Sequence, residues 1–485
     1  MNQIKIVFTI LCFATISHFA KCEEKPIHPN VIMISVDDMN DWVSCLNNFQ
    51  ILKTPNLDRM AEMGTLFTNA YCAAPLCNPS RTAIFTGMSP ARTGIVNNAR
   101  NKSGAWKLRW PDLNTLPLWF KKNGYTVVGG GKTYHETVPE LFNPLHQWDE
   151  YFPLEIEKFK QKPHVEKLGI KDREWFSDMP SHPNGSWDWG PFFCDDFDMG
   201  DGKTTKWAMD FLEKKHNKPF FLALGLFHPH LPFYAPKKYF DAIPLEMVKL
   251  PDAPDWDLDD LPVGARKYMQ AGNDEGFKMI MENGELKNAT RAYLASIAYV
   301  DALIGYFLKA LENSDYADNT IIVFWSDHGY QFGEKGRFAK QALWRRASRI
   351  LFTIKAPGYT KPNVICEQPV SLIDIFPTLL ELCKLPAPEH PLDGITLVPQ
   401  LTDAGKQRRP TVITHGLGND AVCDDRWTYI RYQDGGEELY NRQVDINEWT
   451  NLAGSNNYKD IIERLKQWIP ENQGITLMPV DKNED

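Results

Sequence analysis

The sequence predicts an α/β protein whose central strands are parallel and buried on both faces. Four apolar runs lack the alternation of a half-exposed strand, which is typical of strands covered by helices on both sides. Stretches with helical periodicity separate these runs, so strand and helix alternate along the chain. The chain has 485 residues, 43% of them hydrophobic, which is enough for one large domain and a smaller one.

Each of the four predicted strands ends in chemically active side chains. The strands are expected within residues 30–38, 125–135, 219–230 and 319–329. Ligands of open α/β sheets bind beyond the carboxyl ends of the strands. We therefore expect one rim of the sheet to gather the residues that close these runs, which are Asp37, Asp38, Lys132, His135, His228, His230, Asp327 and His328.

The sequence also predicts helices between the strands and a second, smaller domain. The helices are expected within residues 57–64, 116–124, 203–216 and 291–313. After about residue 405 the sequence changes to short strand-like segments with turns, followed by a helix around residues 458–469. This pattern predicts a large domain over residues 23–404 and a small α+β subdomain over residues 405–485.

The N-terminus has the pattern of a signal peptide over residues 1–22, with Lys5 ahead of a short apolar run. Lipidation of Cys22 is disfavoured by its neighbour Lys21. We expect export to a periplasm or the exterior, or to a lysosome-type compartment in a eukaryote. No later segment reads as apolar over a membrane-spanning length, so no membrane anchor is expected. A net charge of −9 excludes a general nucleic-acid binder.

The segment "LCNPSRTAIFTG" places Cys77 at the predicted start of a helix. Seven cysteines remain after the predicted signal peptide, and an odd number in an exported protein leaves one thiol unpaired or chemically converted. A helix N-terminus favours an anion, so Cys77 could be a nucleophile of low pKa. The cysteine phosphatase loop has five residues between its Cys and Arg, whereas three separate Cys77 from Arg81.

The same segment resembles the signature of type I sulfatases, Cys-x-Pro-Ser-Arg followed by Thr-Gly. Further stretches resemble the iduronate-2-sulfatase-like branch, namely "SVDDMND", "GGGKTYH", "SDHGYQFGEKGRFAK" and "ELYNRQVDINEWTNLA". The resemblance implies an alkaline-phosphatase-like fold, with a mixed sheet flanked by helices and a small C-terminal subdomain. It also implies an enzyme that hydrolyses O-sulfate esters, with Cys77 oxidised to formylglycine by a maturation enzyme.

The resemblance also assigns roles to the residues of the predicted rim. Asp37, Asp38, Asp327 and His328 match the ligands of a divalent cation, Ca²⁺ by analogy, which lies next to residue 77. Three carboxylates suit a hard cation. Family residues that orient and assist the formylglycine correspond to Arg81 and His135, and sulfate-binding lysines correspond to Lys132 and Lys340.

Two departures from the family pattern bear on the substrate. Phe227 stands where relatives have a histidine near the leaving group, so we expect His228 to protonate the leaving oxygen, or Lys340 to act alone. His230 is expected to bind substrate or to brace its loop. Arg345, followed by a second arginine, stands where relatives often have an acidic residue, which favours an acidic glycan as substrate.

The predicted substrate is a sulfated carbohydrate, either an algal polysaccharide such as ulvan or a glycosaminoglycan uronate 2-sulfate. Two alternatives stay open at this point. One is a phosphoester or phosphonate hydrolase of the same superfamily, and the other is a catalytically silent protein that binds sulfated glycans.

Overall fold

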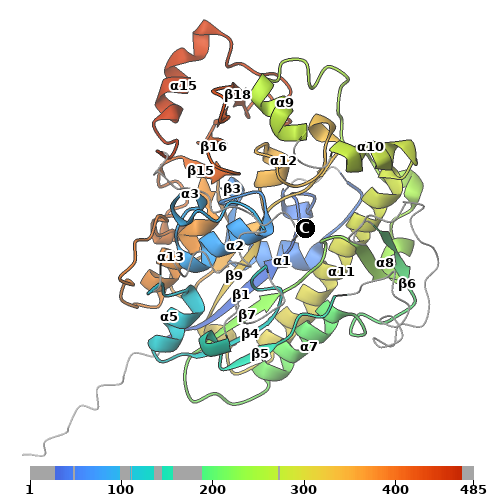
Figure 1. Cartoon of the computed structure of the whole chain (residues 1–485). Helices are drawn as coiled ribbons and strands as arrows, with labels where there is room; N and C mark the ends of the chain where they lie inside the picture. Colours follow the sequence, from blue (N-terminus) through green and yellow to red (C-terminus); the bar gives the residue numbers. More distant parts are fainter. Residues whose placement is uncertain are drawn as a thin grey trace, which may run out of the picture.

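The computed structural model describes residues 28–46, 50–98, 110, 112–135, 145–156, 188–270 and 274–471. The predicted signal peptide, residues 1–22, lies outside the described residues. A twisted central sheet runs through the molecule with helices on both sides, and a smaller unit that ends in α15 packs at one end (Figure 1).

The central sheet has eight strands in the order β13-β2-β12-β9-β1-β7-β4-β5. Its five consecutive strands from β9 to β5 are parallel, whereas β12 is antiparallel to both of its neighbours. The predicted α/β fold with a mixed, largely parallel sheet is therefore confirmed. The strand bounds are β1 Asn30–Val36, β2 Thr65–Phe67, β4 Thr126–Gly131, β5 Glu150–Phe152, β7 Phe220–Gly225, β9 Thr320–Ser326, β12 Phe352–Lys355 and β13 Val364–Cys366.

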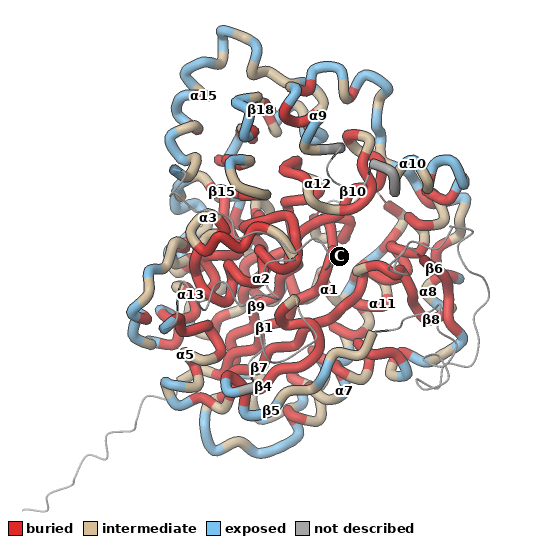
Figure 2. The backbone as a smooth tube through the Cα atoms, in the orientation of Figure 1, coloured by how far each residue is buried: buried red, intermediate tan, exposed pale blue. Residues whose placement is uncertain are grey.

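Strand β1 shows why the apolar runs do not alternate. Ile32 and Ile34 face one hydrophobic layer, while Val31 and Met33 face the other. All seven residues of β1 are buried. Burying each large apolar side chain contributes about 1.5–3 kcal/mol, so helices on both faces stabilise this strand. Figure 2 shows the resulting buried centre, with exposed residues mainly on the outer helices and loops.

The two helical layers come from distant parts of the chain. Helix α11 packs on α1, α7 and α8 on one side, and α2 packs on α5 and α13 on the other. The helix bounds are α1 Pro55–Glu62, α2 Cys77–Thr86, α3 Pro90–Thr93, α5 Leu116–Lys122, α7 Gly200–Leu212, α8 Lys237–Asp241, α9 Val263–Gln270, α10 Asp274–Glu282, α11 Leu286–Glu312, α12 Arg345–Ser348, α13 Ile375–Leu382 and α14 Val398–Thr402.

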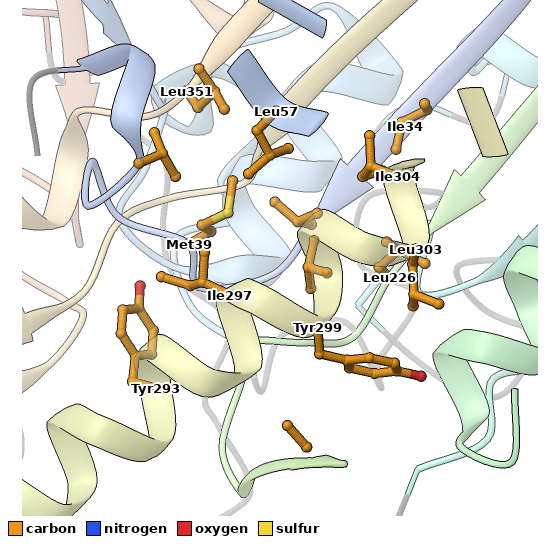
Figure 3. Close-up of a cluster of buried hydrophobic side chains, with 14 of the residues drawn as sticks. Ile34, Met39, Leu57, Leu226, Tyr293, Ile297, Tyr299, Leu303, Ile304 and Leu351 are labelled. Atoms are coloured by element: carbon orange, nitrogen blue, oxygen red, sulfur yellow. The ribbon is translucent and has the colours of Figure 1, made fainter. Parts of the chain in front are cut away.

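Helix α11 corrects one expectation from the sequence. Within the described residues it is long and apolar enough to cross a membrane by length and composition. In the structure, 67% of its most apolar window is buried inside the protein. Figure 3 shows Tyr293, Ile297 and Ile304 of this helix among side chains of the core. Its apolar character is explained by packing, because a helix that is mostly covered by the core has a correspondingly small polar face.

The C-terminal subdomain is a four-stranded antiparallel sheet with one helix against it. Its strands follow chain order, β15 Thr411–Thr414, β16 Asp420–Cys423, β17 Trp427–Arg431 and β18 Glu437–Asn441, and its helix is α15 Lys459–Lys466. Ile462 and Leu465 of α15 pack on Tyr429 and Leu439 of the sheet. The domain border predicted at residue 405 falls in the connection between α14 and β15.

Three two-stranded sheets lie outside these two units. They pair β3 Ala70–Tyr71 with β14 Val370–Ser371, β6 Trp189–Phe192 with β8 Phe233–Pro236, and β10 Gln331–Phe332 with β11 Phe338–Ala339. The β10–β11 pair brings the chain that follows β9 back over the rim of the central sheet.

Candidate active site

The four strands predicted to carry functional residues are neighbours in the central sheet. They occur in the order β9-β1-β7-β4 and are parallel, so their carboxyl ends meet at one rim. The residues that follow these ends are Asp37 and Asp38 after β1, Lys132 and His135 after β4, His228 and His230 after β7, and Asp327 and His328 after β9. This is the arrangement that the sequence predicts.

Glycines allow β4 and β7 to approach closely at this rim. Gly131 has φ of +69°, and a Cβ atom there would lie 2.0 Å from the carbonyl oxygen of Gly225. A Cβ atom on Gly225 would in turn lie 2.2 Å from the carbonyl carbon of Lys132. Only glycine fits both positions without displacing backbone. The glycines before Lys132 therefore set where its side chain leaves the sheet.

Cys77 is the first residue of α2 and is fully buried. Its sulfur accepts a hydrogen bond from Nζ of Lys340 at 3.0 Å and lies 3.3 Å from Nε2 of His328. Ser80, one turn into the helix, donates from its hydroxyl to the carbonyl oxygen of Asp327 at 2.7 Å. The start of α2 is thus fastened to the end of β9, although 250 residues separate them in sequence.

Three carboxylates and three cations surround Cys77. Asp37 pairs with Lys132, Asp38 pairs with Nζ of Lys340 at 2.7 Å, and Asp327 accepts from Nε of Arg81 at 2.8 Å. Arg81 has no exposed surface, and its Nη1 also donates to the carbonyl oxygens of Lys132 and Thr133. The guanidinium therefore holds the ends of β4 and β9 together from within.

Comparison with known proteins identifies the family of this chain. The family "Sulfatase" matches residues 29–385, and the family "N-sulphoglucosamine sulphohydrolase, C-terminal" matches residues 333–474. The chain belongs to the sulfatase family. A sulfatase of Formosa agariphila is 39% identical over 452 residues, 91% of this chain and 86% of the relative. Iduronate 2-sulfatase of Mus musculus is 29% identical over 401 residues, 74% of this chain and 69% of the relative. The resemblance expected from the motifs is confirmed.

Solved structures agree with this sulfatase in fold. A phosphonate monoester hydrolase of Agrobacterium radiobacter superposes with a TM-score of 0.74 at 21% identity, over 91% of this chain and 94% of that one. A 2-O GAG sulfatase superposes with a TM-score of 0.66 at 20% identity, over 91% of this chain and 90% of that one. At these identities the likeness establishes the alkaline-phosphatase-like fold.

The rim of the sulfatase has the donor set of a cation site. Ligand atoms of Asp37, Cys77, Asp327 and His328 all lie within 4.8 Å of one another, and those of Asp38, Cys77 and His230 form a second such group. The Oδ1 atom of Asp37 is buried without a hydrogen-bond partner, which is costly unless a cation or donor satisfies it. These residues therefore fit a divalent cation held mainly by carboxylates.

The charges around residue 77 favour an anion there. Burial alone would raise the pKa of the Cys77 thiol, but Lys340, Lys132 and His328 hold that pKa well below its ordinary value. Burial also opposes the charged form of His328, yet Asp327 and Cys77 raise its pKa to about 9. The pKa of Asp327 is raised, chiefly by burial. A sulfur in this setting is held as a thiolate by its neighbours.

The two histidines after β7 have different surroundings. His228 is buried, and its Nδ1 lies 2.7 Å from a carboxylate oxygen of Asp201, which also accepts from the backbone N–H groups of Phe227 and His228. His230 is about a fifth exposed, and its Nε2 lies 3.8 Å from Asp38. The Nδ1 side of the His228 ring is thus fixed by Asp201, while Nε2 of His230 lies near the carboxylate cluster.

Lys340 is placed by an unusual stretch of backbone. The residues on either side, Ala339 and Gln341, have φ of +105° and +67°. Both are in a region that side-chain-bearing residues rarely adopt, at a cost of order 1–3 kcal/mol each. The N–H of Gln341 donates to the carbonyl oxygen of Pro75 at 3.0 Å, two residues before Cys77. This contact ties the lysine loop to the approach of α2.

Arg345, at the start of α12, lies apart from the groups that contact Cys77. Its Nη1 donates to Asp41 at 3.1 Å, and Asp41 follows the carboxylates of β1 by three residues. Sequence reasoning missed Asp41 and Asp201. An acidic residue in the first turn of a helix, as Asp201 is in α7, is ordinary in any helix, so the sequence carried no signal for its role at the rim.

Proposed function

We propose that this sulfatase is an exported enzyme that hydrolyses an O-sulfate ester of a sulfated carbohydrate. The observation that carries the proposal is Cys77, fully buried at the start of α2 and surrounded by Lys132, Lys340 and Arg81 together with the three aspartates. The 2-O GAG sulfatase that shares its fold, and the similarity to iduronate 2-sulfatase, support a sugar sulfate as the substrate.

The charge of the site matches an anionic ester. Arg81, Lys132 and Lys340 balance Asp37, Asp38 and Asp327, so a bound divalent cation would leave the rim positive. A sulfate ester carries negative charge and would be drawn to this rim. When bound, Ca²⁺ would polarise a sulfate oxygen, and the hydrated formylglycine at residue 77 would supply the oxygen nucleophile.

The chain's own residues have the following proposed tasks. Asp37, Asp38, Asp327 and His328 hold the cation. Lys132 and Lys340 hold sulfate oxygens and offset the charge that develops on them as the ester bond breaks. Arg81 fixes Asp327 and the end of β4, and His135, a neighbour of Cys77, orients the group at residue 77.

The leaving group requires a proton. Overall, one water is consumed, the bond between sulfur and the leaving oxygen breaks, and the sugar hydroxyl gains a proton. His228, whose Nδ1 lies against Asp201, stays a candidate through its other ring nitrogen, and His230 lies at the carboxylate cluster. We propose His230 as the acid because of this position, with Lys340 as the other group within the cluster.

The test compares two chromogenic esters and a panel of sulfated oligosaccharides. The protein, produced with a formylglycine-generating enzyme, should release sulfate from 4-nitrophenyl sulfate and from at least one sugar sulfate. It should turn over 4-nitrophenyl phenylphosphonate far more slowly. Faster turnover of the phosphonate would instead support the alternative suggested by the phosphonate monoester hydrolase fold. Binding of sulfated glycans without any release would identify a silent binding protein.

A further inference from the structure

A cavity of about 510 Å³ lies beside the active site, between the large domain and the C-terminal subdomain. Its charged wall is formed by Arg345 and Arg346 in the single turn of α12 and by Arg349 at the C-terminal end of that turn. Lys249 is a further basic residue of the lining, and Asp41, Asp252 and Glu334 are its acidic residues. None of the residues around Cys77 lines this cavity.

Three guanidinium groups share one carboxylate in this cavity. Asp41 accepts from Arg345 at 3.1 Å and from Arg349 at 2.7 Å, and it also pairs with Arg346. Glu334 accepts from Nε of Arg346 at 2.9 Å, and Glu448 accepts from the backbone N–H of Arg345 at 2.7 Å. The lining has four basic residues, Arg345, Arg346, Arg349 and Lys249, against three acidic ones, Asp41, Asp252 and Glu334, so it keeps an excess of one positive charge.

The titration of neighbouring groups agrees with this excess. Burial raises the pKa of Glu334 to about 7, so near neutral pH it is only partly charged. Burial, and then repulsion from Arg349, lower the pKa of Arg345 and of Arg346 to about 9. A lining with more basic than acidic groups would gain from an additional anion.

Two short links connect the lining of the cavity with the residues around Cys77: a stretch of chain and a backbone hydrogen bond. Asp41 follows Asp38 by three residues, so their Cα atoms are at most about 11 Å apart. The N–H of Gly329, next to the ligand His328, donates to the carbonyl oxygen of Ala347 in α12 at 2.9 Å. The cavity is therefore near enough for one elongated ligand to occupy both places.

The mouth of the cavity combines exposed polar residues, Lys249, Asp252 and Asn447, with exposed apolar ones. Leu250 and Ile446 line it and are 41% and 56% exposed. Trp256, in the same loop as Leu250, is 49% exposed and meets Trp449 edge to face at 6.4 Å. Exposed apolar and aromatic side chains beside a cationic wall suit a ring that has apolar faces and a charged substituent.

We propose that this cavity is a second anion-binding subsite, which holds a sulfate or carboxylate group on a sugar next to the one whose ester is cleaved. The proposal rests on the proposed function, since it names the substrate class as a glycan with a second anionic group. Arg345 binds that group in this assignment, in keeping with the substrate contact expected from its sequence context.

The test measures binding without turnover. In the Cys77→Ala protein, calorimetry compares two glycosaminoglycan disaccharides of the same backbone, one with a single sulfate and one with a second sulfate on the adjacent sugar. We expect the disulfated ligand to bind about tenfold more tightly, as for one added charge-assisted contact. Arg345→Gln should reduce this preference below about threefold, while Asp41 keeps two arginine partners.

A second variant and a matched control keep the test independent of folding. Asn447→Asp adds a negative charge to the exposed lining without removing any arginine contact, and it should reduce the preference in the same way. Arg59→Gln removes an exposed arginine paired with Glu312 and should leave the preference intact. Equal preference in all variants, equal affinity for the two disaccharides, or no binding of either would overturn the proposal.

Binding of inorganic sulfate distinguishes a free anion from an anionic group on a sugar. Sulfate release distinguishes failure of the proposed function from failure of the subsite. If inorganic sulfate binds with an affinity that Arg345→Gln lowers, while the two disaccharides bind equally, the cavity holds a free anion and the subsite proposal is wrong. Sulfate release is measured separately with the Cys77 protein. A lack of release there contradicts the proposed function, whereas loss of the binding preference contradicts only the subsite.

Discussion

Replacing Arg81 with lysine preserves its charge but should strongly destabilise the fold. The guanidinium donates to Asp327 at 2.8 Å and to the carbonyl oxygens of Lys132 and Thr133. Lysine donates from a single atom, so it cannot serve acceptors on the ends of two strands as a planar fork can. The bond to the buried carboxylate contributes about 1.5–3 kcal/mol, and the two carbonyl bonds about 1 kcal/mol each.

Lysine can keep one of these three bonds, so the expected loss is that of the other two, about 2–4 kcal/mol. That loss lowers the ratio of folded to unfolded protein about 30- to 10³-fold. Urea unfolding with a chelator present, followed by tryptophan fluorescence, measures it without a contribution from bound metal. Trp325, whose ring lies 5.4 Å from the Arg81 guanidinium carbon, is well placed as a reporter.

The control is Arg59→Lys, which alters an exposed pair with Glu312. An exposed ion pair contributes about 0–1 kcal/mol, so its urea midpoint should hardly move. If Arg81→Lys lowers the midpoint no further than Arg59→Lys, Arg81 does not hold the ends of β4 and β9 together and the reasoning fails.

The other predictions concern the chemistry of the site. In protein produced with a maturation enzyme, mass spectrometry should find an aldehyde in place of the Cys77 thiol, and Cys77→Ala should be folded but inactive; full activity in that variant would refute the nucleophile. Chelation should abolish activity, Ca²⁺ should restore it better than Zn²⁺, and Asp37→Asn should resemble metal loss, because carboxylates favour a hard cation. An unchanged rate after exhaustive chelation would contradict the cation site. His230→Ala should slow a sugar sulfate about 10²- to 10⁴-fold and 4-nitrophenyl sulfate much less, because nitrophenolate leaves without a proton. The same selective loss in His228→Ala, and not in His230→Ala, would return the role of acid to His228.

The sequence predicts the rim well because the end of a buried strand can be recognised from the few residues around it. Apolar runs without alternation predict strands that are buried on both faces, and such strands are usually parallel. The carboxyl ends of neighbouring parallel strands lie at the same rim, so the residues after Val36 and Ser326 lie close together. The same reasoning could not decide between His228 and His230. Their orientation depends on Asp201 from α7 and on the carboxylates of β1, which are contacts between distant segments.

Two other features were beyond a reading of the sequence for related reasons. Arginines 345, 346 and 349 converge on Asp41 from 300 residues away, and no local pattern reports such a meeting. The length and apolar composition of α11 do not show whether protein or membrane covers it, since a core helix and a membrane helix can have the same composition. In both cases the sequence does not say which distant residues pack against the segment.

The burial of Cys77 limits when its proposed conversion to formylglycine can take place. Every residue of α2 is buried, and the side chains that cover the sulfur, His328 and Lys340, arrive 251 and 263 residues later in the chain. The strand that delivers His328, β9, lies between β1 and β12 in the middle of the sheet, so the sheet cannot close before it is made. The enzyme that we propose to oxidise the thiol would therefore have to meet the chain while it is still being made or still unfolded. On this proposal, a cysteine that is missed before the sheet closes would stay a cysteine in the folded molecule.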